Sequence, residues 1–297
     1  MRIRIALPAC AIALVLLGDV LLLTQQDRST AVSLDAAVKG FRATDSQSSE
    51  TTFTTIAPRG PSSPGSPTSA APARGAAPTP ARPSATTAAA TPAPFRLPVQ
   101  GVYAYRTQGH ETVSMGGGRH DYPERTFATV RAKGGCDWEL EHRVLEEHIE
   151  RRLQCSGPGQ LTEKDERVDI TFFGQKNTAY YRCDPPLVLA QAGDQPGAKR
   201  TGTCRADDGQ AVLTTTFVGR ERLTIGGVAV DAIRVRMEGV VSGRAEGTSF
   251  SDTWAHPDTG LMLKSIRKVD TRAKAFGTTV DYREEATYEL EKLEPAT

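Results

Sequence analysis

The stretch TWAHPDTGLMLKSIRK, Thr253–Lys268, contains residue types that could do chemistry. His256 lies two residues before Asp258, and Asp252 lies just upstream. An imidazole held beside a carboxylate can act as a general base. The same letters also fit a tight turn, because the proline fixes φ and the glycine three residues later accepts a positive φ. A catalytic role needs a third oriented group and a pocket, and the sequence indicates neither. We therefore expect a hairpin tip here.

Three other patterns fall short of known catalytic or binding motifs. His142 and His148 flank RVLEE, which does not have the H-E-x-x-H spacing of zinc proteases, so we expect two exposed histidines on either side of a turn. The run GGGRH, which ends at His120, lacks the Lys-Ser/Thr of a phosphate loop and predicts a flexible hairpin loop. The run GTSFSD around Ser249 is not G-x-S-x-G. We predict no catalytic residue, no cofactor site and no metal site.

Four cysteines form the strongest chemical pattern: Cys136, Cys155, Cys183 and Cys204. An even number of cysteines outside the cytoplasm indicates two disulfides, and four cysteines allow three pairings. The sequential pairing, Cys136–Cys155 and Cys183–Cys204, is the simplest. Zinc is disfavoured because the spacing contains no C-x2-C pair. The fifth cysteine, Cys10, lies in an apolar segment and is expected to stay unpaired.

The segment between the first two cysteines, WELEHRVLEEHIERRL, has apolar spacings that suit a helix or a hairpin. A helix filling it would hold its ends about 28 Å apart, whereas the Cα atoms of a disulfide lie roughly 4.4–6.8 Å apart. If Cys136 and Cys155 are bonded, the segment is a hairpin that turns near 145–147.

Strand signals recur from Phe95 to Thr297. Runs such as GVYAYRT, RTFATVRA, AVLTTTFVG and VAVDAIRVRMEG alternate or are apolar throughout, and Gly, Pro, Asp and Asn fill the gaps between them. Short strands with a turn signal every ten or so residues indicate an antiparallel domain. We predict a mostly β fold at 95–297, with one strongly curved antiparallel sheet of hairpins.

The N-terminal residues predict a membrane anchor. Residues 5–23, IALPACAIALVLLGDVLLL, are long enough to cross a bilayer as a helix. Arg2 and Arg4 precede them, and the positive-inside rule then places residues 1–4 in the cytoplasm. Nothing after Leu23 offers an A-x-A cleavage site. We predict a signal-anchor helix at 5–24, which makes this a single-pass plasma-membrane protein with its C-terminal domain outside.

Two further segments separate the anchor from the β domain. Residues 25–43 contain Leu34, Val38 and Phe41 at helical spacing, which predicts either a short helix, on the membrane surface or packed on the ectodomain, or a frayed segment. Residues 44–94 are rich in Pro, Ala, Ser and Thr and are expected to be disordered. Such a stalk could reach about 150 Å and would hold the domain away from the membrane.

The charge balance argues against nucleic acid as a partner. The 36 Lys and Arg residues are matched by 35 Asp and Glu residues, whereas binding to phosphates needs a concentrated basic surface.

The run GRERLTIGGVAVDAIRVRMEGVVSG and the later DTWAHPDTGLMLKSIRK lie within Gly219–Lys268. They resemble the late hairpins of DUF3108-type and LolA/LppX-like envelope proteins. Those proteins have a G-x-E-x-L-x-x-G-G hairpin, a strand with Trp, a P-D-T-G-L turn and a return strand. They lack the stalk, and their early region is usually helical. The resemblance implies a curved sheet with an apolar concave face. The whole chain also resembles Arg-rich single-pass proteins of actinobacteria that carry four cysteines outside the membrane.

These features predict a non-enzymatic ectodomain that acts in the cell envelope as a binding or structural module. The expected partners are the membrane, through residues 5–24, and an envelope or cell-wall protein. The alternative is a lipid or lipoprotein carrier with an open apolar half-barrel, which adds lipid as a partner. An envelope hydrolase is a third reading, and no triad or metal pattern supports it.

Overall fold

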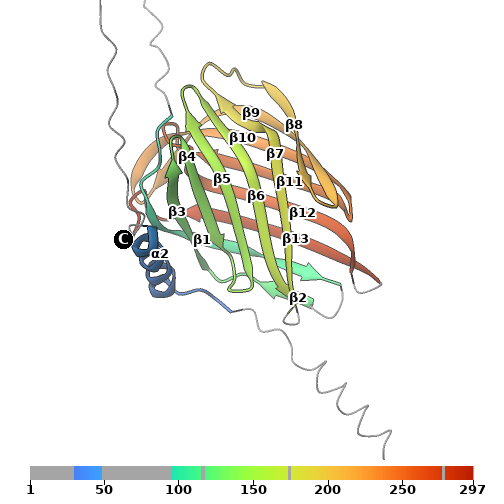
Figure 1. Ribbon diagram of the computed structural model, residues 1–297. Helices are drawn as coiled ribbons and strands as arrows, with labels where there is room; N and C mark the ends of the chain where they lie inside the picture. Colours follow the sequence, from blue (N-terminus) through green and yellow to red (C-terminus); the bar gives the residue numbers. More distant parts are fainter. Residues whose placement is uncertain (1–29, 49–94, 115–117, 173–174, 276–277, 297) are drawn as a thin grey trace, which may run out of the picture.

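The computed structural model of the protein describes residues 30–48, 95–114, 118–172, 175–275 and 278–296 (Figure 1). The predicted cytoplasmic residues 1–4, the predicted anchor 5–24 with Cys10, and most of the predicted stalk lie outside these ranges. Among the described residues, no helix is long and apolar enough to cross a membrane.

The described part of the domain is built from β-strands, as the sequence predicts. In chain order they are β1 (Gly101–Val113), β2 (Gly118–Asp121), β3 (Arg125–Gly134), β4 (Asp137–Arg143), β5 (His148–Gly157), β6 (Gln160–Phe172), β7 (Gln175–Gln191), β8 (Lys199–Ala206), β9 (Gly209–Ile225), β10 (Val228–Gly243), β11 (Ala245–Ala255), β12 (Met262–Ala275) and β13 (Thr278–Leu290). From β3 to β13 each strand pairs antiparallel with the next.

The sheet closes on itself, which corrects the predicted single curved sheet. β1 pairs with β3 along its first half and with β13 from Tyr105↔Leu290 to Val113↔Tyr282. Twelve strands therefore form a closed antiparallel barrel, and the short β2 adds to the end of β1. Figure 1 shows β3–β7 in front of β10–β13. Local strand signals could not predict closure, because it joins strands at opposite ends of the domain.

The barrel has two ends, which we call rim A and rim B. Rim A carries the described turns 135–136, 158–159, 226–227 and 256–261, and rim B carries the described turns 144–147, 207–208 and 244. The apolar core fills the barrel towards rim A. Its largest members there include Tyr103, Trp138, Leu161, Ile225, Leu263 and Leu290.

Both predicted hairpins are confirmed. β4 and β5 form a hairpin that turns at 144–147. The His256–Asp258 stretch is the turn between β11 and β12, where His256 N–H donates to Leu261 O at 2.8 Å and Gly260 N–H donates to His256 O at 2.9 Å. Gly260 has φ +77° and lies against Leu161, so a side chain there would be strained and would also clash.

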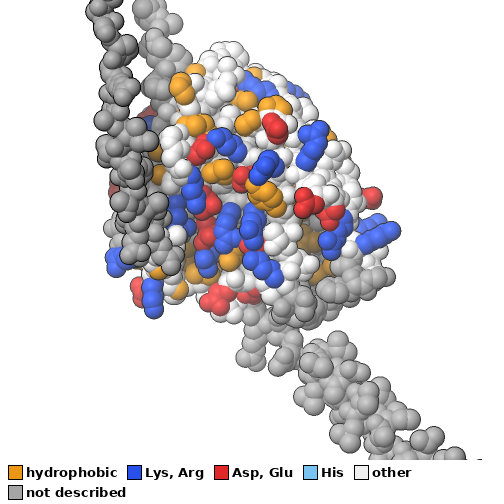
Figure 2. Space-filling model, viewed as in Figure 1, with side chains coloured by type: hydrophobic (Ala, Val, Ile, Leu, Met, Phe, Trp, Pro, Cys, Tyr) orange, Lys and Arg blue, Asp and Glu red, His pale blue; other side chains and the backbone are white. Residues whose placement is uncertain are grey.

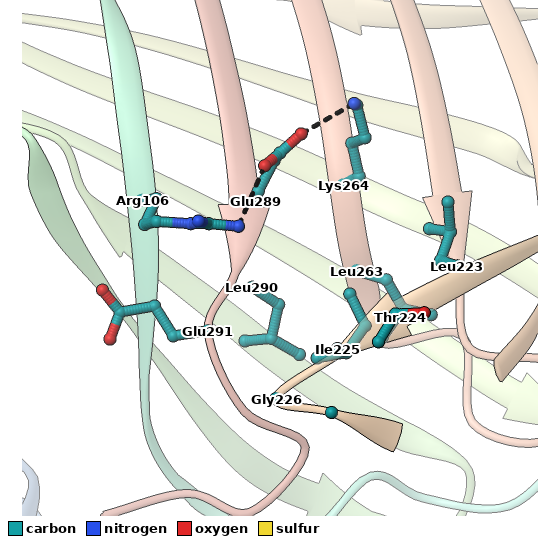
Figure 3. Close-up of a pocket in the computed structure, with 11 residues that line it drawn as sticks. Arg106, Leu223, Thr224, Ile225, Gly226, Leu263, Lys264, Glu289, Leu290 and Glu291 are labelled. Carbon is teal, nitrogen blue, oxygen red and sulfur yellow. Dashed lines mark hydrogen bonds and ion pairs between the residues drawn. The ribbon is translucent and has the colours of Figure 1, made fainter. Parts of the chain in front are cut away.

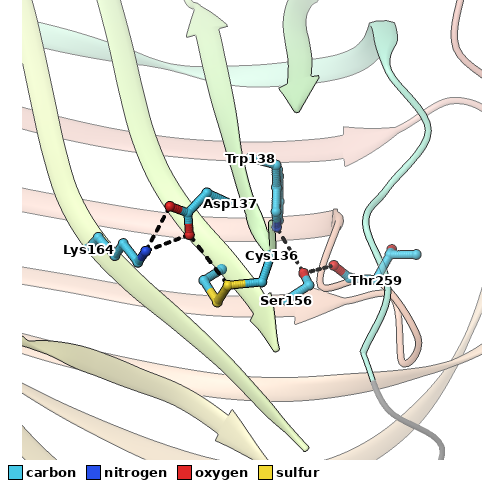
Figure 4. Close-up of a disulfide and its surroundings, with 7 residues drawn as sticks. Cys136, Asp137, Trp138, Ser156, Lys164 and Thr259 are labelled. Atoms are coloured by element: carbon cyan, nitrogen blue, oxygen red, sulfur yellow. Dashed lines mark hydrogen bonds and ion pairs between the residues drawn. A yellow bond between two sulfur atoms is a disulfide. The ribbon is translucent and has the colours of Figure 1, made fainter. Parts of the chain in front are cut away.

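The structure joins Cys136 to Cys155 and Cys183 to Cys204, the sequential pairing. The first bridge lies at rim A, between the start of β4 and the end of β5. Next to it, Trp138 Nε1–H donates to Ser156 Oγ at 2.9 Å, and Ser156 donates to Thr259 O at 2.9 Å (Figure 4). The β4–β5 hairpin is thereby fastened to the β11–β12 turn.

The second bridge lies at the weakest seam of the barrel wall. β7 and β8 share only two described residue pairs, Arg182↔Arg205 and Cys183↔Cys204. On one side the ladder meets Pro185 and Pro186, which lack the N–H that a ladder needs. On the other side β8 ends at Ala206. The disulfide therefore replaces backbone hydrogen bonds as the main link across this seam.

The helix α2, Leu34–Ser48, packs on the outside of the barrel beside β1 and β3 (Figure 1). Ser33 Oγ accepts a hydrogen bond from Ala36 N–H and caps its first turn. Of the placements open from sequence, the structure shows packing on the domain. The helix also continues five residues beyond the predicted boundary at residue 43.

The two disulfides should differ in what their removal exposes. We expect either paired Cys→Ser variant to lose on the order of 2–5 kcal/mol of unfolding free energy. In C183S/C204S, hydrogen exchange should rise first in β7 and β8, because two residue pairs alone remain between these strands. In C136S/C155S, the seven-pair β4–β5 ladder remains and the rise should be confined to rim A. Equal hydrogen-exchange protection of β7 and β8 in the two variants would contradict the role of Cys183–Cys204 as the main link across this seam.

Candidate functional site

The barrel interior contains buried charged side chains, from the rim B end to the middle. His148 and Glu111 are both fully buried, and His148 Nδ1 lies 2.7 Å from Glu111 Oε2. The predicted exposure of His142 and His148 is therefore wrong, since both point into the barrel. His120, expected in a flexible loop, is on β2 and is also buried. The strand register explains why these histidines are buried. Side chains of directly paired residues lie on the same side of the sheet, which for these residues is the inside of the barrel.

Glu111 is the acceptor at one end of this cluster. The hydroxyl groups of Tyr122 and Tyr282 each donate to Glu111 Oε2 at 3.2 Å. His120 Nδ1 lies 3.3 Å from the other carboxylate oxygen. The carboxylate thus has four polar neighbours, contributed by β2, β5, β13 and the segment after β2.

Glu150 and Arg267 connect opposite walls of the barrel, β5 and β12. Arg267, on β12, reaches across the interior to a carboxylate oxygen of Glu150, on β5. Glu150 Oε1 also lies 3.3 Å from His148 Nε2. On the other side, Arg267 Nε lies 3.3 Å from Glu284 Oε2, and the hydroxyl of Tyr288 donates to Glu284 Oε1 at 3.1 Å.

The two strand histidines, His148 and His142, differ in charge at neutral pH. Burial lowers the pKa of His148, but the hydrogen bonds that the ring donates to the carboxylates of Glu111 and Glu150 outweigh it and raise that pKa to about 10. Burial lowers the pKa of His142 to about 4. At neutral pH, His148 is thus a cation between two carboxylates, and His142 is a neutral ring that accepts or donates one hydrogen bond to Thr126 at 2.9 Å.

Little space remains around the cluster. The cavity beside it has a volume of about 10 Å³, with walls that include His142, Glu150, Arg267 and Tyr288. That is room for about one water molecule. The cluster therefore satisfies its own charges and joins the two faces of the barrel, and it offers no space for a substrate.

A larger open cleft of about 410 Å³ lies at rim A (Figure 3). The turn 226–227 between β9 and β10 forms one side, and the ends of β12, β13 and β1 form the other. Its apolar lining consists of Leu223, Ile225, Leu263 and Leu290. This rim pocket is within the size range of small-molecule sites, which run from about 300 to 1,000 Å³.

Four charged side chains line the same rim pocket. Glu289 lies between two cations, 2.7 Å from Lys264 Nζ and 3.3 Å from an Arg106 nitrogen. Its pKa is lowered, chiefly by the hydrogen bond from Lys264. Glu291 accepts from Arg125 Nε at 2.8 Å. The rim pocket therefore combines an apolar lining, most of which is buried in the core, with paired charges at its edge.

Cys136, Asp137 and Cys155 are the one group of close potential metal ligands among the described residues. Both thiols are in the disulfide, so no thiolate is available, and Asp137 binds Lys164 Nζ at 2.6 Å.

The outer face of β4–β6 carries cations and anions side by side (Figure 2). Arg151 contacts Glu141 at 2.7 Å and Asp169 at 2.6 Å. Arg167 and Lys176 also contact Asp169. The charges on this face are largely paired with one another.

No family model and no curated protein matches the chain, and the DUF3108-type resemblance is not confirmed. The solved structures that are similar include two lipoprotein structures. One is the hypothetical lipoprotein YmcC from Escherichia coli K12, with 18% identity, TM-score 0.29, and coverage of 66% of this chain and 85% of that one. The other is a putative lipoprotein from Parabacteroides distasonis, with 10% identity, TM-score 0.30, and coverage of 67% and 98%. Likeness at this level says nothing of function.

His148 should stabilise the fold in a pH-dependent way. Its folded-state pKa, about 10, exceeds the unfolded value of roughly 6.5. The stabilisation is therefore complete below about pH 6.5 and is lost as the pH rises through about 10. We expect H148Q to lose about 3–5 kcal/mol at pH 7, because Glu111 and Glu150 lose a buried cation, and to show a weaker decline towards pH 10. Urea unfolding at a series of pH values measures both the loss at pH 7 and the decline towards pH 10. The control is H110Q, at a half-buried position on β1, which should not show these changes.

Replacement of Glu163 should stabilise the fold at neutral to alkaline pH, whereas replacement of His148 destabilises it. Burial raises the pKa of Glu163 to about 7, so the folded state loses stability as the pH rises from about 4.5 to 7. At pH 8 we expect the unfolding free energy of E163Q, measured by urea unfolding, to exceed that of the wild type by about 1–3 kcal/mol. Near pH 4.5 the two unfolding free energies should be equal. E285Q, on the exposed surface, should change little at either pH. A loss of stability in E163Q at pH 8 would contradict this assignment.

Proposed function

We propose that the chain is a membrane-anchored binding module of the cell envelope, and that it binds an amphiphilic, lipid-like ligand in the rim pocket. The rim pocket supports this proposal most directly, because an apolar lining of four side chains lies beside paired charges. Such a lining favours burial of an apolar body at roughly 25 cal/mol per Å², while the charges can hold a polar head.

The proposal joins the two readings that the sequence suggests, a non-enzymatic module and a lipid carrier. It differs from a carrier with an open half-barrel in where the ligand lies. The centre of the barrel is occupied by the His148 cluster and leaves about 10 Å³, so we place the ligand at rim A. Localisation in the plasma membrane, with the barrel outside, belongs to the same proposal, through residues 5–24 and the two disulfides.

We propose a non-enzymatic role because the titratable groups with the largest pKa shifts lie where a substrate has no room. His142 and Glu150 contact the small central cavity. The acidic groups of the rim pocket, Glu289 and Glu291, are each held by a cation.

Ligand binding can be tested on the full chain in detergent, with a dansyl-labelled fatty acid as the probe. We expect saturable fluorescence enhancement, and about tenfold weaker binding in T224W, because the indole would occupy the rim pocket that Thr224 lines. T248W makes the same change at an exposed position on β11 outside the rim pocket and should bind like the wild type.

Mass spectrometry of organic extracts from the purified full chain should recover an amphiphile from the wild type and less from T224W. Equal probe binding by T224W and T248W would place the ligand elsewhere. The absence of both saturable binding and a co-purified amphiphile would contradict the proposed function.

A further inference from the structure

The first described residue ties the chain to rim B. Thr30 N–H lies 3.1 and 3.2 Å from the two carboxylate oxygens of Glu147. Glu146 N–H donates to Thr30 O at 2.9 Å. Both glutamates lie in the turn 144–147. The chain therefore reaches the barrel at the rim opposite the pocket.

The following helix is fastened to the barrel wall. Val32, Ala37 and Phe41 are buried against Val102 of β1 and Phe127 of β3. Arg131, also on β3, lies with its guanidinium 5.6 Å from the centre of the Phe41 ring. Residues 30–48 are thus part of the barrel body.

The predicted stalk comes after this docked helix in the chain. It leaves the body at Ser48 and returns to it at Phe95, which packs on the core, and Arg96 N–H donates to Asp258 O at 2.7 Å. A segment that starts and ends on one body cannot set the distance of that body from the membrane. With the proposed anchor at residues 5–24, the spacing role predicted for residues 44–94 therefore passes to the residues before Thr30.

The length of chain before Thr30 limits the distance instead. Between the end of the predicted anchor at residue 24 and Thr30 lie residues 25–29. Fully extended, this connection spans roughly 20 Å at about 3.5 Å per residue. The stalk, had it been the spacer, would have allowed about 150 Å.

We infer that rim B faces the lipid bilayer at close range, and that rim A, with its pocket, faces away from the membrane. This inference rests on the proposed anchoring through residues 5–24. The ten residues of β5 separate the two rims by about 30 Å. An amphiphile that occupies the rim pocket has therefore already left the bilayer in which the chain is anchored.

The orientation can be measured on the full chain in liposomes of phosphatidylcholine and phosphatidylglycerol that contain a nickel-chelating lipid as quencher. With C10A as the background, a fluorophore is attached through E146C at rim B or through K292C at rim A. Because about 30 Å separates the rims, we expect several-fold stronger quenching at position 146 than at 292. Equal quenching, or stronger quenching at 292, would overturn the orientation.

Two adjacent alanines provide the control for helix docking. Ala37 is buried against the barrel and Ala36 is exposed. A37D should undock the helix and reduce the difference between the labels, whereas A36D should keep it. Retention of the full difference in A37D, with the helix shown free by hydrogen exchange, would also overturn the inference. Flotation with liposomes distinguishes failure of the proposed anchoring from failure of the proposed orientation. A chain that does not float with the liposomes contradicts the anchoring. A chain that floats but shows no difference in quenching contradicts the orientation alone.

Discussion

Closure of the sheet through β1 and β13 is the constraint on which the rest of the structure depends. Once β1 pairs with both β3 and β13, every strand from β3 to β13 has an inner side that must be filled or satisfied. Apolar residues do this towards rim A, where Trp138 and Leu263 are buried. In the middle the inner positions are charged, so each charge must meet a partner inside the barrel, because burial of an unpaired charge is costly. The chain from Glu111 through His148 and Glu150 to Arg267 meets that requirement.

The closed wall has one weak seam, between β7 and β8. The two disulfides have different roles, because one of them lies at this seam and the other lies on the β4–β5 hairpin. Cys183–Cys204 lies where the ladder between β7 and β8 has two pairs, so it takes over a task that hydrogen bonds perform elsewhere in the wall. Cys136–Cys155 lies beside a longer ladder, and its neighbours Trp138 and Ser156 connect it to the β11–β12 turn. Cys183–Cys204 maintains closure, while Cys136–Cys155 stiffens rim A, the end that carries the rim pocket.

The sequence was sufficient for what depends on local chemistry. Turn residues located the β11–β12 hairpin, cysteine geometry predicted the β4–β5 hairpin, and alternation predicted an antiparallel β domain. It was insufficient wherever two distant strands decide the outcome. In WELEHRVLEEHIERRL, His142 shares its row with Trp138 and Leu140, which is a signal that could have placed it inside. His148 shares a row with Glu150 and Arg152, and an all-polar row reads as exposed. Its burial follows only when Arg267, more than a hundred residues later, is brought opposite Glu150. The rim pocket was missed for the same reason, since its walls come from four strands that closure brings together.

The polarity of the two rims follows from the path of the chain. The N-terminal segment joins at Glu147 on rim B, and the docked helix runs along β1 and β3. An anchored barrel built this way has a short connection at one end and a stiffened, pocket-bearing rim at the other. An open apolar trough could exchange lipid directly with a membrane through its long side, whereas here that side is a closed wall with a charged interior. In the proposed orientation, exchange at the rim pocket takes place on the side away from the bilayer, with a soluble partner or a diffusing amphiphile, and the ion cluster lies between that site and rim B.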